Sequence, residues 1–162
     1  MRALRHLFDA GSVRRRFPPR TLDAIQHAIA ASEQRQPSEI VFAVEGALGL
    51  PALWRRRSAR ERAHEVFAHL RVWNTQHDTG VLIYVLLADR AIEIVADRGI
   101  AARVDASQWQ AVCDLMRQHF STGHYEAGAL AGVAAVSALI EHHFPGCTGG
   151  GSDELPNRPV LL

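Results

Sequence analysis

The chain contains no lysine, and all 18 of its basic side chains are arginine. We interpret this first as genomic codon bias, although the planar guanidinium also suits carboxylate and phosphate partners, which it can bind with two hydrogen bonds. Cysteine is scarce too: Cys113 and Cys147 lie far apart and in no CxxC arrangement. This usage excludes a disulfide framework and favours a reducing compartment.

Long apolar runs are also missing. The longest stretch of low polarity, residues 127–140, has 14 residues, which is short of the roughly 20 that a membrane-spanning helix needs. The first residues, MRALRHLFDAGSVRRRF, lack the apolar centre of a secretory signal. We therefore expect a cytoplasmic protein without a transmembrane segment.

Several signatures of chemistry are absent from the sequence. It has no GxSxG, Walker A or GxGxxG motif, and none of its nine histidines sits in HExxH or beside a CxxC. Cys113 follows an apolar residue in an expected helix, which indicates packing. These absences leave no local sign of a nucleophile, a nucleotide-binding loop or a zinc site.

The composition is that of an ordinary globular protein. With 162 residues, 48% of them hydrophobic and 22% charged, the chain is long enough for one domain with a real core. We expect a basic arm over residues 1–17, an α/β domain over 18–145 and a Gly/Pro-rich tail over 146–162.

Charge is divided unevenly along the chain. Residues 1–71 hold 13 arginines against seven acidic residues, whereas residues 72–162 hold five against ten. Two RRR runs, 14–16 and 55–57, could contact phosphate. The pI of about 8.0 and the lack of interleaved aromatics make nucleic acid an unfavourable partner. The preferred interpretations of the arginine runs are solvated arms or a contact with an acidic partner.

Periodicity predicts an alternation of helices and strands. Apolar spacing and turn residues predict helices near 19–34, 58–73, 105–120 and 124–144, and strands at 39–46, 81–88 and 91–97. Ser58 with Glu61, and Asp105 with Gln108, fit capping boxes.

This order of elements predicts the topology of the sheet. A strand–helix–strand crossover makes the first two strands parallel, and the Asp89-Arg90 turn adds an antiparallel strand. We expect a three-layer α/β sandwich in which a small mixed β-sheet is flanked by helices.

Acidic residues surround the hairpin in two groups. If residues 81–88 pair with 91–98 through a two-residue turn, Asp97 lies opposite Leu82 and near Asp78, while Asp89 lies roughly 20–25 Å away. The first group is Asp78 and Asp97 with Arg98. The second group lies at the carboxyl ends of the parallel strands, where ligands usually bind in such sheets, and consists of Glu45, Asp89 and Arg90.

Each group has two interpretations. Carboxylates around a loop could hold a hard cation such as calcium or magnesium through oxygen, with Asp78 and Asp97 as ligands and Arg98 as an anion-binding residue. The alternative is a set of solvated turn residues and an Asp–Arg pair.

The segment VWNTQHDTGVLIYVLLADRAIEIVADRGI resembles the core of the TPM domain family. The shared pattern is a helix ending near Trp, a polar loop, Gly, an apolar strand, a charged turn, a second strand and a Gly-containing loop. The matching residues are Trp73, Asp78, Gly80, Asp89, Arg90, Glu93 and Gly99. FSTGHYEAGALAGVAAVSALI resembles the closing segment of the family.

The resemblance implies an α/β sandwich and two possible functions. Some plant members of the family are assigned acid phosphatase activity, some members bind calcium, and an animal member is a receptor auxiliary protein. Because the charge asymmetry suits docking and no nucleophile is evident, we prefer an interaction or accessory module that supports an envelope or membrane-associated protein. The alternative is a metal-assisted phosphatase acting on phosphomonoesters with calcium or magnesium.

Overall fold

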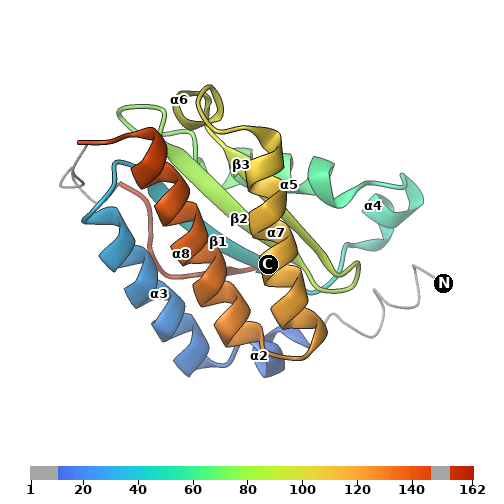
Figure 1. The fold of residues 1–162 in the computed structure, drawn as a ribbon. Coiled ribbons are helices and arrows are strands. Elements are labelled where there is room, and N and C mark those ends of the chain that lie inside the picture. Colours follow the sequence, from blue (N-terminus) through green and yellow to red (C-terminus); the bar gives the residue numbers. More distant parts are fainter. Residues whose placement is uncertain (1–10, 147–153) are drawn as a thin grey trace.

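The computed structural model describes residues 11–146 and 154–162. In this part of the chain a sheet lies between two helical layers (Figure 1). In chain order the elements are α2 (Val13–Arg16), α3 (Pro19–Glu33), β1 (Glu39–Glu45), α4 (Leu50–Trp54), α5 (Ala59–His69), β2 (Gly80–Leu86), β3 (Ala91–Ala96), α6 (Arg98–Ala101), α7 (Ala106–Ser121), α8 (Tyr125–His143) and β4 (Val160–Leu161).

The sheet is mixed and has the strand order β3-β2-β1-β4. β1 and β2 run parallel, from the Glu39–Gly80 pair to the Glu45–Leu86 pair, and α5 provides the crossover between them. β3 returns antiparallel to β2. The expected parallel pair and hairpin, and with them the three-layer α/β sandwich, are confirmed.

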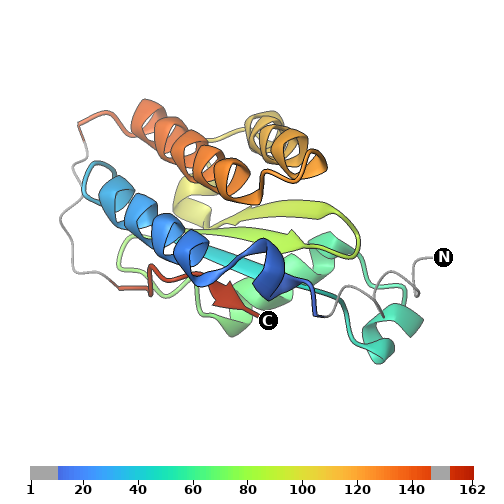
Figure 2. The ribbon, with the colours of Figure 1, turned by 90° about the horizontal axis from the view of Figure 1, so that it is seen from below.

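Helices cover both faces of the sheet. α3, α7 and α8 lie on one face and α5 lies on the other (Figure 2). β1 contributes side chains to the apolar clusters on both faces, because successive side chains of a strand point to opposite faces. Phe42 belongs to the cluster under α3 and α8, whereas Val41 belongs to the cluster under α5. A strand buried on both faces reads as a continuous apolar run, as EIVFAVE nearly does.

Both expected capping boxes are formed. The Glu61 amide donates to Ser58 Oγ at 3.1 Å, and the Ser58 amide donates to Glu61 Oε2 at 2.8 Å. Asp105 and Gln108 make the equivalent exchange at the start of α7. These boxes satisfy amides that have no partner within the first helical turn.

The hairpin has a different register from the one the sequence predicts. Val81 pairs with Ala96, so a four-residue turn replaces the expected two-residue turn, and the Asp97 amide donates to Gly80 O at 2.8 Å. Asp97 therefore lies opposite Gly80 and not Leu82. The reason is that Leu87 and Ala88 continue to bond to β1, through Glu45 O and Gly46 O, both at 3.0 Å.

Two segments expected to lie outside the domain contribute to it. Phe17, from the expected basic arm, is 1% exposed, and its ring centroid lies 5.8–6.2 Å from those of Phe42, Phe120 and Tyr125. At the other end, β4 pairs in parallel with β1 at Ala43 and Val44. Residues 1–10 and 147–153 of the expected arm and tail, which include Cys147, lie outside the described residues.

Candidate functional site

The sequence-predicted residues lie at two opposite ends of the sheet, as expected. Asp78, Asp97 and Arg98 gather where β2 begins and β3 ends. Glu45, Asp89 and Arg90 belong to the end where β1 and β2 finish. The structure therefore brings together the first group, and it divides the second.

Asp78 and Arg98 form a two-point ion pair. Arg98 Nε and Nη2 donate to the two carboxylate oxygens of Asp78 at 2.7 and 3.2 Å. This hydrogen bonding lowers the pKa of Asp78 and raises the pKa of Arg98. Arg98 thus occupies both carboxylate oxygens of Asp78 in this structure.

Asp97 begins the short helix α6. Its Oδ1 accepts the amide of Arg98 at 2.8 Å, whereas its Oδ2 is buried without a hydrogen-bond partner. The backbone is tight here: a Cβ added at Gly99 would lie 2.6 Å from Asp78 O and 2.9 Å from His77 O. The close approach of these carbonyls explains why glycine follows Arg98.

A cation at this end of the sheet would need several oxygen ligands. Calcium takes six to eight oxygen ligands, and here Asp97 Oδ2 is the one buried carboxylate oxygen left over. Across residues 11–146 and 154–162, no three His, Cys, Asp or Glu side chains come close enough to hold a metal. The assignment of Asp78 and Asp97 as metal ligands stays a prediction, and it would require Arg98 to release Asp78.

In the second group, Glu45 points away from Arg90 and into the layer under α5. It is 6% exposed. Arg62 donates to its two oxygens at 2.9 and 3.0 Å, and the Tyr84 hydroxyl donates to Oε2 at 2.6 Å. Burial, followed by the hydrogen bond to Glu45, raises the pKa of Tyr84. The carboxylate is fully engaged, so Glu45 is a structural residue.

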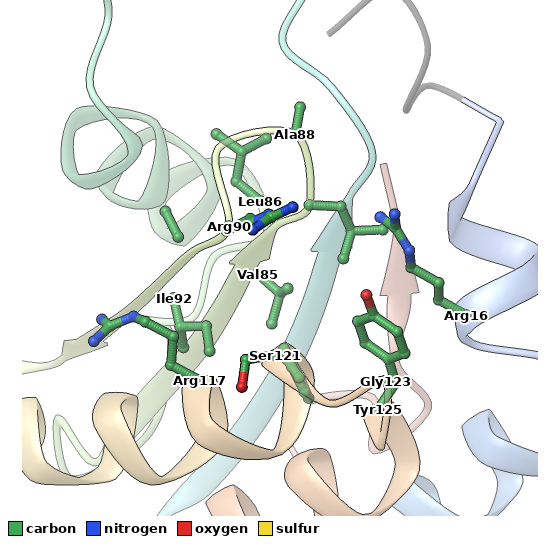
Figure 3. Close-up of a pocket in the computed structure, with 13 residues that line it drawn as sticks. Arg16, Val85, Leu86, Ala88, Arg90, Ile92, Arg117, Ser121, Gly123 and Tyr125 are labelled. Carbon is green, nitrogen blue, oxygen red and sulfur yellow. The ribbon is translucent and has the colours of Figure 1, made fainter. Parts of the chain in front are cut away.

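Arg90 instead lines a cavity of about 360 Å³ on the opposite face of the sheet (Figure 3). It closes the hairpin turn in the left-handed region, at φ 52°. Arg16 from α2 and Arg117 from α7 line the same cavity, and among the residues that the structure describes they are the other charged residues of the lining. The cavity lies at the carboxyl end of β2 and the start of β3, and the sequence predicts ligand binding at the carboxyl ends of the parallel strands.

The cavity combines basic groups with an apolar floor. Figure 3 shows Arg16 beside Tyr125 on one side and Arg117 on the other side. The Arg16 guanidinium carbon lies 5.5 Å from the centre of the Tyr125 ring, and Arg117 pairs with Asp114. Apolar side chains complete the lining, among them Val85, Leu87, Ile92 and Phe120. Such a site suits a ligand with an acidic group attached to an apolar part.

The sequence predicts Arg90 as a site residue but not its neighbours. Arg16 lies in the segment predicted as a basic arm, and Tyr125 lies at the start of the last helix. Arg117 has the pattern of an exposed helical residue, three positions after Asp114. Only the packing of α2, α7 and α8 beside the hairpin turn brings them together, so no local signal could have found them.

The family model for the TPM domain matches residues 15–139 of the chain. Among solved structures, the BA42 protein from the psychrophilic bacterium Bizionia argentinensis is similar, with 26% identity, a TM-score of 0.73, and coverage of 88% of this chain and 93% of that chain. The N-terminal domain of a protein from P. gingivalis shares the fold at 18% identity and a TM-score of 0.62, over 76% of each chain. A search of curated proteins finds no match.

Proposed function

This chain belongs to the TPM domain family, and from that premise we propose that it is a non-catalytic interaction module whose cavity beside Arg90 binds an acidic group of a protein partner. The observation that carries the proposal is the lining of the cavity. Within the described part of the chain, its charged residues are arginines, Arg16, Arg90 and Arg117, and they stand around apolar side chains. We place this activity in the cytoplasm, in support of an envelope or membrane-associated protein.

The polar groups of the cavity favour binding over group transfer. A serine nucleophile needs an adjacent base. Ser121 lines the cavity, but its hydroxyl donates to Gln118 O at 2.7 Å, and no histidine or carboxylate of residues 11–146 and 154–162 belongs to the lining. Arginine is a permanent cation with several donors and no acceptor, so it binds an anion but does not serve as a general base.

The charge distribution supports an acidic protein segment as the ligand. Arg90 is exposed at the hairpin turn, and the apolar floor lies directly behind it. A carboxylate of the partner would contact the guanidinium groups while a neighbouring apolar side chain enters the cavity. Charged groups at the rim mainly set the association rate and the specificity, and the buried apolar contact supplies affinity.

The test is an NMR titration in which the whole protein is mixed with a peptide of alternating aspartate and leucine. Binding should shift the amide signals of the hairpin turn and of the first turn of α8. Arg90→Gln should weaken binding about tenfold, because it removes a charge-assisted hydrogen bond.

Arg71→Gln is the matched control. Arg71 is also exposed and left-handed, at φ 54°, but it follows α5 at the other end of the sheet. Binding that both variants weaken equally, or that neither weakens, would count against the cavity. Inorganic phosphate is the second probe. Its binding would show that the site accepts any anion, and its failure to bind would show that the ligand also needs an apolar part.

The alternative function is the metal-assisted phosphatase. Its supporting observation is the buried, unpartnered Oδ2 of Asp97, and it would require Arg98 to release Asp78. Hydrolysis of a generic phosphomonoester should then depend on calcium or magnesium, disappear with chelator and be lost in Asp97→Asn. Absence of hydrolysis with either metal favours the interaction module, and hydrolysis that survives Asp97→Asn excludes this assignment.

A further inference from the structure

The segment between β1 and α5 presents exposed apolar side chains to solvent. Within the described residues, Trp54 at 87% and Leu50 at 67% are the most exposed of the large hydrophobic side chains. They lie four positions apart on α4 and therefore share one face of this helix. Pro51 beside them is exposed too. We refer to Leu50, Pro51, Trp54, Arg55 and Arg56 as the α4 tip.

The opposite side of α4 fixes the tip to the domain. Ala52 and Leu53 pack against the apolar cluster under α5. The segment closes on itself because the Arg57 amide donates to Ala52 O at 3.0 Å, and the Arg57 side chain pairs with Glu65 of α5. Figures 1 and 2 both place α4 at the periphery of the domain. The tip is thus an anchored projection whose apolar residues face outward.

The sequence of the tip and its flanks carries charge of one sign. Residues 46–60 contain four arginines and no acidic residue, and two of the four, Arg57 and Arg60, pair with Glu65 and Glu93 from elsewhere in the chain. Arg55 and Arg56 follow Trp54 directly and are both exposed. The exposed Trp54 ring therefore lies next to two solvent-exposed arginines, Arg55 and Arg56, at the edge of the domain.

From this combination we infer that the α4 tip docks on the surface of a bilayer that contains anionic phospholipid. Tryptophan favours the membrane–water interface, where its ring is in an apolar region and its N–H remains hydrated. Arginines beside the ring contact lipid phosphates, and each basic residue near an anionic surface contributes about 1 kcal/mol. The inference is independent of the Arg90 cavity.

The size of the tip distinguishes a membrane from a protein partner. A stable protein interface buries about 800 Å² on each side and uses roughly 20–30 residues. The tip offers five residues. Shallow insertion of a leucine and a tryptophan, supported by charge, fits weak and reversible membrane binding.

Sedimentation of the full chain with lipid vesicles tests the inference. We expect partition into vesicles of equal parts phosphatidylcholine and phosphatidylglycerol, and much weaker partition into phosphatidylcholine alone. Arg55→Gln with Arg56→Gln should weaken binding roughly thirty-fold, and Trp54→Ala should weaken it at least tenfold. Because the Trp54 side chain is 87% exposed, we expect the alanine variant to fold normally.

The matched control replaces Arg14 and Arg15 by glutamine. These two arginines are adjacent and exposed and come from the other arginine run, so this variant has the same net charge as the Arg55 and Arg56 variant. A second readout uses a variant in which Trp73 and Trp109 are phenylalanine, leaving Trp54 as the single tryptophan. Its fluorescence should shift to the blue with anionic vesicles and be quenched by brominated lipid.

Some results would overturn the inference. One is absence of partition into anionic vesicles, and another is partition that the Arg14 and Arg15 variant loses equally. An unchanged Trp54 spectrum in sedimented vesicles would place the contact elsewhere on the protein. Concentration-dependent dimerisation that Trp54→Ala abolishes would identify a second copy of the chain as the occupant instead.

Discussion

Tyr84 donates a hydrogen bond of 2.6 Å to Glu45 across two neighbouring parallel strands. Arg62 reaches the same carboxylate from α5, so a buried charge is matched by three donors. A buried ionised group is stable only with such partners. The arrangement ties the crossover helix to both central strands.

Removing the Tyr84 hydroxyl should destabilise the fold. Tyr84→Phe keeps the ring, which is fully buried, but removes a donor to a charged acceptor. We expect the free energy of unfolding in urea to fall by about 2 kcal/mol. Tyr125→Phe is the control, and an equal loss in both variants would contradict this role.

Alkaline titration should show the raised pKa of Tyr84. In Tyr125→Phe, Tyr84 is the only tyrosine, and its phenolate should not form near pH 10 while the protein is folded. Because the pKa is raised in the folded state, the contribution to stability is complete below about pH 10 and falls as the pH rises further, at most about 1.4 kcal/mol per pH unit. Ultraviolet absorbance follows the phenolate, and Tyr84→Phe should lack this pH dependence.

Gly80→Ala should be among the most damaging single substitutions. A Cβ at this position would clash with the backbone carbonyl of Val72, which cannot rotate away as a side chain could. We expect a loss of about 3 kcal/mol or more in unfolding free energy. Gly11→Ala, where nothing lies within 4 Å, is the control. A stable Gly80→Ala protein would mean that the loop before β2 can shift.

Arg98 should control the ionisation of Asp78. Replacing Arg98 by glutamine removes the guanidinium that stabilises the carboxylate, so the pKa of Asp78 should rise toward its ordinary value. Carboxyl carbon NMR titration measures this shift directly. Arg90→Gln, at the other end of the sheet, should leave the Asp78 titration unchanged. No shift in Arg98→Gln would show that the pair does not persist in solution.

Cys113 should be unreactive while the protein is folded. It is 5% exposed, and burial in the first place raises the pKa of its thiol to about 11. In a Cys147→Ser variant, a disulfide reagent at neutral pH should therefore label Cys113 only as fast as the protein opens. Labelling should become rapid in denaturant. Fast labelling of the folded protein would show that the α7 face opens locally.

Local patterns predict most of the fold, whereas contacts distant in sequence decide the rest. The Ser58 and Asp105 caps and the crossover can be read from short stretches, because each depends on residues a few positions apart. The hairpin register cannot be read from a short stretch, because Leu87 and Ala88 make hydrogen bonds at the end of β1 to residues about 40 positions earlier. Arg90 then adopts the left-handed conformation that the longer turn requires.

The candidate sites divide in the same way. The Asp78–Arg98 pair is predictable because a hairpin brings its two segments together. The position of Glu45 at the end of β1 groups it with Arg90 in the sequence. The alternation of side chains along the strand instead places Glu45 on the other face of the sheet, beside Tyr84. The cavity needs Arg16 and Arg117, which reach it from two helices packed on the sheet.

The place of Phe17 has a practical consequence for work with this domain. A boundary drawn at residue 18 on compositional grounds would discard a ring that joins strand and helix at one corner of the core. Truncated proteins starting there would carry a void about the size of a phenyl group, with Phe42, Phe120 and Tyr125 around it. Shortened versions of the domain should therefore retain the residues from Ser12 onward.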